Sequence, residues 1–271
     1  MEICVVVKRI IVCTKPVPDP KLWDKVSVDP VTRTLKRQGI PSIINPLDKH
    51  ALEAALSIQE AQGGEVVLLS MAPTFTTSTL REGLAMGADR AVLLSDPLFA
   101  GSDTLATAHI LAAGCRWIGQ FDLILCGNLT IDGSTAQVGS QLAEFLDLPN
   151  VMHVIDLDWQ ATHTMIITQK IEHGYTKLRA SLPVVLSIRK ELNRPRYIPF
   201  AGIIAAESKE IEVLTNDDLR IDPTLIGLEG SPTKMAGLEI RRFERARERL
   251  EGSVDEIVQK LVDKIYQYGV I

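Results

Sequence analysis

The sequence at residues 127–139 reads Gly127-Asn128-Leu129-Thr130-Ile131-Asp132-Gly133-Ser134-Thr135-Ala136-Gln137-Val138-Gly139. This polar, glycine-bearing stretch follows the apolar run 121–126, which predicts a buried parallel strand. It leads into residues 135–146, whose pattern predicts a helix. In an open α/β sheet, ligands bind at such strand-to-helix turns, and the free N–H groups of a helix start favour a phosphate. Asp132 and Ser134 are also typical helix-capping residues, so the turn alone leaves capping and phosphate binding both open.

The chain before this turn alternates between strand patterns and helix patterns. Buried strands are predicted at residues 10–14, 66–70 and 91–95. Helices are predicted from Asn45-Pro46 to Gly63-Gly64, at residues 79–86 and at residues 102–118. Residues 15–20 contain three prolines and predict a stiff extended turn. This alternation predicts an α/β fold with an open, mostly parallel sheet and helices on both faces.

The pattern changes after residue 150. Alternating residues between 151 and 182 predict an antiparallel hairpin, and the apolar run 183–188 predicts a strand that rejoins the main sheet. Residues 193–203 show no regular pattern, and the apolar positions between 254 and 266 form one helical stripe. We therefore expect a nucleotide-binding domain at residues 1–215 and an extended C-terminal arm at 216–271 that ends in a helix. A long irregular tail is typical of a segment that wraps a partner, although the stripe would equally suit packing on the chain's own domain.

Composition limits the classes of function. The chain has 271 residues, 46% of them apolar, and a net charge of −5 with no basic block, which argues against nucleic-acid binding. The four cysteines, Cys4, Cys13, Cys115 and Cys126, have neither CxxC nor metal-ligand spacing, so we expect no metal site and a reducing, cytoplasmic compartment. No apolar run is long enough to span a bilayer, so we expect no membrane insertion, and the start does not resemble a secretory signal. Residues 5–7 suit either an extra edge strand or a disordered lead.

Several segments together resemble the small (beta) subunit of electron transfer flavoproteins. They follow the family's order over roughly residues 9–215, and six such matches are far more specific than one glycine-rich turn. The matching segments are Ile10–Asp19, Asp29–Pro46, Leu80–Asp89, Ala100–Thr107, the 127–139 turn and Asn193–Tyr197.

The resemblance implies a nucleotide-hydrolase-like, Rossmann-type fold and a heterodimer with an FAD-containing alpha subunit. Such a complex passes electrons between a dehydrogenase, of acyl-CoA type or similar, and an acceptor. The simplest members hold AMP in the beta-subunit cleft. Electron-bifurcating members hold a second FAD there and meet NADH. Residues 131–139 and 100–107 of this chain look closer to the bifurcating type.

The resemblance also implies a set of cofactor-binding residues, none of which acts as a catalytic acid, base or nucleophile. Cys13 and Met71 would pack on a purine ring, whereas Asn45 would bind adenine or ribose, cap its helix, or do both. Asp132 would orient the loop or accept a ribose hydroxyl, and N–H groups of Ser134–Gln137 would bind phosphate. The full set is Cys13, Asn45, Asp48, Met71, Thr104, Thr107, Gly127, Asn128, Asp132, Gly133, Ser134, Thr135, Ala136, Gln137 and Val138.

A partner-docking loop is implied at about residues 194–204. Its candidate contacts are Arg196, Tyr197, Phe200 and Ile203, with Phe200 as a protruding apolar anchor. The alternative is that Phe200 closes the core of its own domain.

The identity of the nucleotide stays open between FAD and AMP. Bifurcating members usually have a polar pair such as Arg-Gln where Asn128-Leu129 stand, and Asp where Ser134 stands. A nucleotide-sensing module without redox chemistry would need the same turn but neither the docking loop nor the arm. An adenylate-cleaving enzyme ranks last, because residues 15–18 are too poor in donors to hold pyrophosphate.

Overall fold

The computed structural model describes residues 7–25, 27–28, 35–36, 41–161, 163–234 and 247–269. The chain divides into two compact units, Met1–Ala236 and Gly237–Ile271. Residues 5 and 6, for which an edge strand or a disordered lead was predicted, lie outside the described residues. Val7 is fully buried and precedes the first strand. Parts of the 29–46 segment, and most of the charged stretch after residue 234, also lie outside them.

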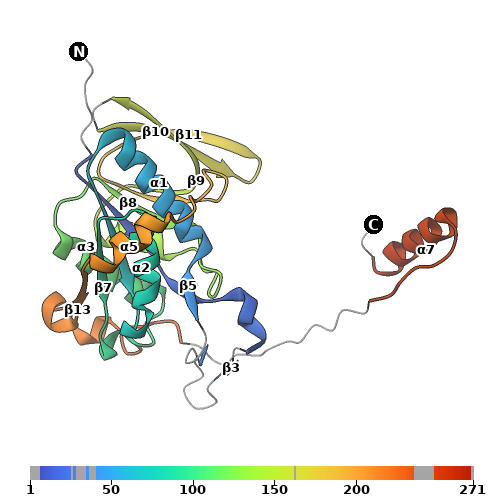
Figure 1. The fold of residues 1–271 in the computed structure, drawn as a ribbon, viewed down its shortest axis with the longest axis horizontal. Coiled ribbons are helices and arrows are strands. Elements are labelled where there is room, and N and C mark those ends of the chain that lie inside the picture. Colours follow the sequence, from blue (N-terminus) through green and yellow to red (C-terminus); the bar gives the residue numbers. More distant parts are fainter. Residues whose placement is uncertain are drawn as a thin grey trace. The chain divides into compact units, whose positions relative to one another are not determined.

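The first unit is built on one nine-stranded sheet (Figure 1). Its strand order is β11-β10-β9-β12-β8-β1-β6-β7-β13. The strands are β1 (Arg9–Cys13), β6 (Glu65–Met71), β7 (Arg90–Leu94), β8 (Leu123–Gly127), β9 (Asn150–Ala161), β10 (Thr164–Ile171), β11 (Gly174–Ser181), β12 (Val184–Ile188) and β13 (Ile211–Leu214). Strands β9, β12, β8, β1, β6, β7 and β13 pair in parallel, so the predicted open, mostly parallel sheet is confirmed.

The antiparallel part is larger than a hairpin. Strands β9, β10 and β11 form a three-stranded meander, and β9 joins it to the parallel sheet by pairing with β12. Strand β13, which the sequence analysis did not predict, adds the opposite edge by pairing with β7. The sequence signal for β13 is weak, because only its last residue, Leu214, is buried.

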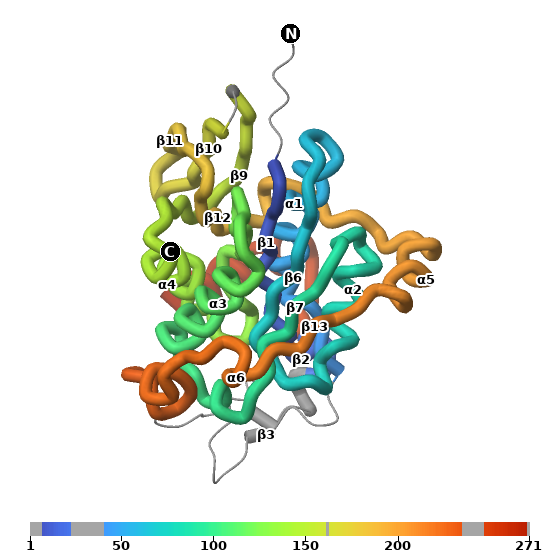
Figure 2. Tube along the Cα trace, turned by 90° about the vertical axis from the view of Figure 1, so that its left-hand side faces the viewer, coloured from blue at the N-terminus to red at the C-terminus, as the bar shows by residue number. Residues whose placement is uncertain are grey.

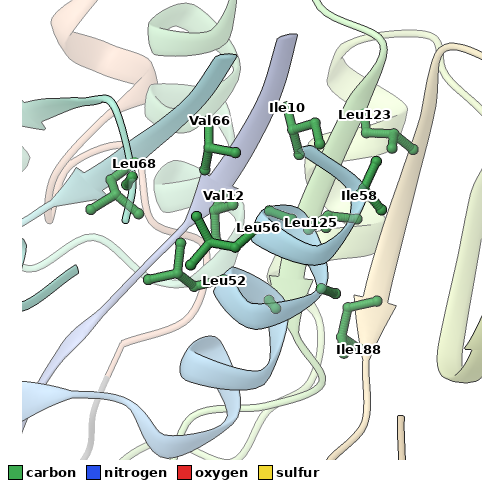
Figure 3. Packing of buried hydrophobic residues seen from close by; sticks show 14 of the residues in the cluster. Ile10, Val12, Leu52, Leu56, Ile58, Val66, Leu68, Leu123, Leu125 and Ile188 are labelled. Carbon is green, nitrogen blue, oxygen red and sulfur yellow. The ribbon is translucent and has the colours of Figure 1, made fainter. Parts of the chain in front are cut away.

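Helices cover both faces of the sheet (Figure 2). Helices α1 (Pro46–Gln62), α2 (Thr77–Met86) and α5 (Phe200–Ser208) lie on one face. Helices α3 (Thr104–Ile118) and α4 (Val138–Phe145) lie on the other. Figure 3 shows the first core, where Leu52 and Leu56 of α1 pack against Val12 and neighbouring strand residues. Because both faces are buried, the central strands are continuous apolar runs rather than alternating ones.

Two helix starts differ from the sequence prediction. Helix α4 begins at Val138 instead of residue 135, so Asp132 and Ser134 precede it by several residues and the prediction that they cap it is wrong. Helix α3 begins at Thr104 instead of residue 102, because Asp103 is its cap and accepts hydrogen bonds from the N–H groups of Leu105 and Ala106.

Short elements complete the first unit. The proline-rich turn forms strand β2 (Pro16–Pro18), which pairs with β5 (Ser42–Ile44), and β3 (Ser27–Val28) pairs with β4 (Leu35–Lys36). The 3-10 turns are η1 (Pro20–Lys25), η2 (Thr74–Thr76), η3 (Pro97–Phe99) and η4 (Pro223–Leu225), and α6 is Asn216–Leu219. Ile221 and Ile226, which the sequence analysis assigned to the arm, are buried in the core beneath α3 and α4.

The second unit contains helix α7 (Val254–Gln267), which matches the predicted stripe. Its start is held by a capping box in which Ser253 and Glu256 bond each other's backbone N–H groups. Val254, Val258 and Leu261 of the stripe are exposed within this unit. No helix in the described part of the chain is both long and apolar enough to cross a membrane.

Candidate functional site

The candidate site lies where the direction of strand addition reverses. From β1 the chain adds β6 and β7 on one side of the sheet, and later adds β8 and β12 on the other. Cys13 of β1 stands directly opposite Cys126 of β8, so the carboxyl ends of these strands meet at one edge. Gly127, which ends β8, and Met71, which ends β6, lie at that same edge. In open α/β sheets this switch point is the place where ligands bind.

Asp48 ties three segments of the site together. Its Oδ2 accepts a hydrogen bond from the Lys15 N–H at 2.8 Å, and its Oδ1 accepts one from Asn45 Nδ2 at 2.9 Å. A Cβ on Gly127 would lie 2.2 Å from Asp48 Oδ1, so only glycine lets the end of β8 approach α1 this closely. The side chain is almost fully buried, and burial raises the pKa of Asp48 to about 7 against the opposing effect of the Asn45 and Lys15 donors.

Asn45 bonds the 127–139 turn and does not cap its own helix. It occupies the position before α1 but makes no side-chain cap, so that part of its predicted role is wrong. Instead its Nδ2 donates to Leu129 O at 2.9 Å, and its Oδ1 accepts from Ile131 N–H at 3.2 Å. The side chain is fully buried, and its Nδ2 also bonds Asp48. Long-range hydrogen bonds to both the Nδ2 and the Oδ1 of this buried amide therefore replace the local cap.

Lys15 is a site residue that the sequence analysis missed. Its Nζ forms an ion pair with Asp132 Oδ1 at 2.8 Å, and the Asp132 side chain is only 4% exposed. Lys15 sits in the proline-rich turn that looked too poor in donors, and β2–β5 pairing sets the position of that turn. The only sequence signal was a lysine directly after the first buried strand. This pair supports the loop-orienting role predicted for Asp132.

The turn itself is unusual in its backbone. Ser134 and Ala136 have φ values of 51° and 55°, the left-handed region that non-glycine residues rarely adopt. Ser134 N–H bonds Thr130 O at 2.8 Å, whereas the N–H groups of Thr135, Ala136 and Gln137 have no intrachain acceptor among the described residues. Successive N–H groups in a conformation of this kind suit an anion. By contrast, a Cβ on Gly133 would meet only Thr130 Oγ1, at 3.6 Å.

The remaining candidates divide into two groups. Thr104 Oγ1 bonds Gln137 Oε1 at 3.0 Å and so joins the start of α3 to the turn, whereas Thr107 makes no side-chain bond to it. Cys13, Met71 and Val138 contribute to the core beneath α3 and α4. The pKa of Cys13 is raised by its hydrogen bond with Cys126 and by burial, so its thiol stays protonated, as expected of a small buried hydrophobe.

Three buried polar atoms at this edge suit a polar ligand. Thr14 Oγ1, Ser70 Oγ and Asn128 Oδ1 lie at or near the ends of β1, β6 and β8, and none has a hydrogen-bond partner within the described residues. Buried polar atoms are normally satisfied, so these three fit a ligand or water at the switch point. Thr14 and Ser70 were not predicted, since single hydroxyls inside apolar strands carry no motif. Among the described residues, no group of His, Cys, Asp and Glu is arranged to hold a metal.

The predicted docking residues lie along helix α1 and at the start of α5. Tyr197 is 99% exposed and Phe200 is 77% exposed, so the alternative in which Phe200 closes the core is wrong. Residues 200–203, expected to be irregular, form the first turn of α5. Arg196 differs from its neighbours, because its side chain pairs with Glu53 and Glu60 of α1.

Comparison with known proteins shows the family of the chain. A family model described as "Electron transfer flavoprotein domain" matches residues 32–219. The chain belongs to the electron transfer flavoprotein beta subunit family. The chain is 46% identical over 264 residues to the electron transfer flavoprotein subunit beta of Thermoanaerobacterium thermosaccharolyticum, covering 97% of this chain and all of that protein.

Two further relatives are named as parts of larger complexes. The caffeyl-CoA reductase-Etf complex subunit CarD of Acetobacterium woodii is 42% identical, and the acryloyl-CoA reductase electron transfer subunit gamma of Anaerotignum propionicum is 38% identical. Each match covers 97% of this chain and all of the relative. The resemblance on which the sequence analysis relied is thereby confirmed for the family.

Proposed function

We propose that this chain is the beta subunit of an electron transfer flavoprotein that pairs with an FAD-containing alpha subunit. Together they would carry electrons between a dehydrogenase and an acceptor. Family membership over nearly the whole chain supports this role, as do the exposed aromatic residues Tyr197 and Phe200. An acyl-CoA-type partner and a cytoplasmic location are part of the proposal, the partner because two relatives are named for CoA-ester reductases.

The observation that carries the proposal is the set of unpaired polar groups at the β1/β8 switch point. The N–H groups of Thr135–Gln137 would bind phosphate. The ion pair between Lys15 and Asp132 would hold the turn that presents these N–H groups. Thr14 and Asn128 supply buried side-chain oxygens for a ribose or base edge. When bound, a flavin would supply the electron-accepting chemistry, while this chain would position it and exclude water.

A second FAD in this cleft, as in bifurcating members with NADH as a further reactant, is the form we favour over AMP. The names of the CoA-reductase relatives and the 131–139 segment support that choice. AMP would use the same phosphate donors and would make the chain a structural nucleotide binder. A nucleotide-sensing module without redox chemistry would leave the exposed Tyr197 and Phe200 without a role.

The test is to count nucleotides released from the chain after purification with its co-expressed larger subunit. Two FAD per heterodimer would support the bifurcating form, and one FAD with one AMP would support the simple carrier. A colourless homodimer, with neither flavin nor larger subunit, would refute the proposal. Gly133→Ala serves as a matched variant, since a Cβ there would meet only Thr130 Oγ1, at 3.6 Å, and only the occupancy of this cleft should fall.

A further inference from the structure

Arg196 makes an unusually complete set of bonds to helix α1. Its Nε donates to Glu53 Oε2 at 2.9 Å and its Nη2 donates to Glu53 Oε1 at 3.0 Å, which is a bidentate pair. Its backbone N–H also donates to Glu53 Oε2 at 2.9 Å, and its Nη1 donates to Glu60 Oε1 at 2.5 Å. The Glu53 side chain is only 10% exposed, so it faces the protein and not a partner.

A second pair of bonds fixes the same segment. Asn193 Nδ2 donates to the backbone oxygen of His50 at 2.9 Å, and Asn193 Oδ1 lies 2.9 Å from His50 Nδ1. His50 stands one turn before Glu53 on α1. Residues 193–196 are therefore anchored along one helix at two successive turns.

The chain is anchored again just beyond the exposed aromatic residues. A Cβ on Gly202 would lie 2.3 Å from Ala85 O, so α5 packs directly on the end of α2. Arg81 of α2 donates to the backbone oxygens of Ala206 and Lys209. Tyr197 and Phe200 thus lie between two anchored segments, with their side chains in solvent.

The charge around Arg196 also argues against direct contact with a partner. All three of its guanidinium nitrogens already donate to carboxylates, and the two glutamates leave the cluster with a net negative charge. A carboxylate on a docking protein would gain little from a cation that is already paired.

We propose that Arg196 is a positioning residue, which holds the 193–199 segment on α1 so that Tyr197 and Phe200 project toward the partner. The residue does not itself touch the electron donor. This inference rests on the proposed function, because it assigns a role within the docking surface of an electron carrier. It replaces the expectation that Arg196 is one of the docking contacts.

The test compares Arg196→Gln with Glu53→Gln in the co-purified complex, using an acyl-CoA dehydrogenase as donor and a dichlorophenolindophenol dye as final acceptor. Each variant should raise the KM for the dehydrogenase about tenfold, with kcat and bound nucleotide unchanged, because both break the same bidentate pair. Arg196→Lys keeps the charge but cannot form the bidentate pair, so its KM should lie between those of wild type and Arg196→Gln. The double variant Arg196→Gln with Phe200→Ala should have the same KM as Phe200→Ala alone, because both changes act through the same side chain.

Two results would overturn the proposal. One is a raised KM in Arg196→Gln with a wild-type KM in Glu53→Gln, which would mean that Arg196 contacts the donor directly. The other is an unchanged KM in both variants. If the wild-type complex transfers no electrons, the proposed function fails, yet amide hydrogen exchange at positions 196, 202 and 203, whose N–H groups are hydrogen-bonded, still tests the anchor. Exchange should be at least about tenfold faster in both variants, and unchanged exchange would refute the anchoring role.

Discussion

Asp48 should make the folded chain less stable as the pH rises from about 4 to about 7. Its pKa is about 7 in the folded protein, against an ordinary value of 3.8. Between these values the folded state holds a proton that the unfolded chain releases. Stability from this group is therefore fully present below about pH 4 and is lost as the pH rises through 7. A difference of about three pKa units corresponds to about 4 kcal/mol, and the near-complete burial of Asp48 calls for no discount.

The measurement is guanidinium unfolding of nucleotide-free protein at several pH values from 4.5 to 8, about the window set by these pKa values. Asp48→Asn cannot titrate, so the difference in unfolding free energy between wild type and variant isolates the one carboxyl. Other groups titrate in both proteins and cancel. The variant also loses a hydrogen-bond acceptor, which should lower its stability by about 1–3 kcal/mol at every pH without changing the slope.

The expected result is that wild type loses about 3 of these 4 kcal/mol relative to Asp48→Asn between pH 4.5 and 8, because part of the loss occurs below about pH 4.5. Asp217 is an exposed residue on α6, so Asp217→Asn is the control. Its unfolding free energy should change with pH as that of wild type does. Parallel pH curves for wild type and Asp48→Asn would refute the reasoning, because they would mean that Asp48 has the same pKa in the folded and the unfolded chain.

Three further changes test the site and the arm. Gly127→Ala should lower the free energy of unfolding by about 1–3 kcal/mol, since its Cβ would collide with the start of α1. Gly133→Ala should change that free energy by less than about 0.5 kcal/mol yet reduce nucleotide content. An equal loss of stability in both variants would contradict this. Lys15→Gln should weaken nucleotide binding about tenfold in equilibrium titrations, because the ion pair that holds the turn through Asp132 is lost. Lys15→Arg keeps the pair and should stay close to wild type. Unchanged affinity in Lys15→Gln would remove Lys15 from the site. A chain ending at Ala236 should keep its nucleotide but separate from the larger subunit during gel filtration, and a stable complex would show that the arm is not needed.

The sequence predicted the sheet class because its signals are local. Continuous apolar runs such as 121–126 and helical periodicity in residues 46–62 depend only on neighbours along the chain, and both elements formed as expected. Strand β13 was missed, because it is short and half exposed and is recognisable only by its pairing with β7. The helix start at Val138 was also misjudged, since the polar residues before it serve the turn rather than a cap.

The candidate site, like the fold, could be predicted from the sequence only in part. The 127–139 turn was evident from its composition and from its place after a strand, and the family resemblance rested on residues that any reader of the chain can see. What the tertiary structure alone decided is which side chains meet: Lys15 with Asp132, Asn45 with the turn, and Arg196 with Glu53. These partners are separated by 84 to 143 residues along the chain. No local pattern encodes such pairs, because each forms only when the sheet has brought distant strand ends and helix faces within hydrogen-bond distance.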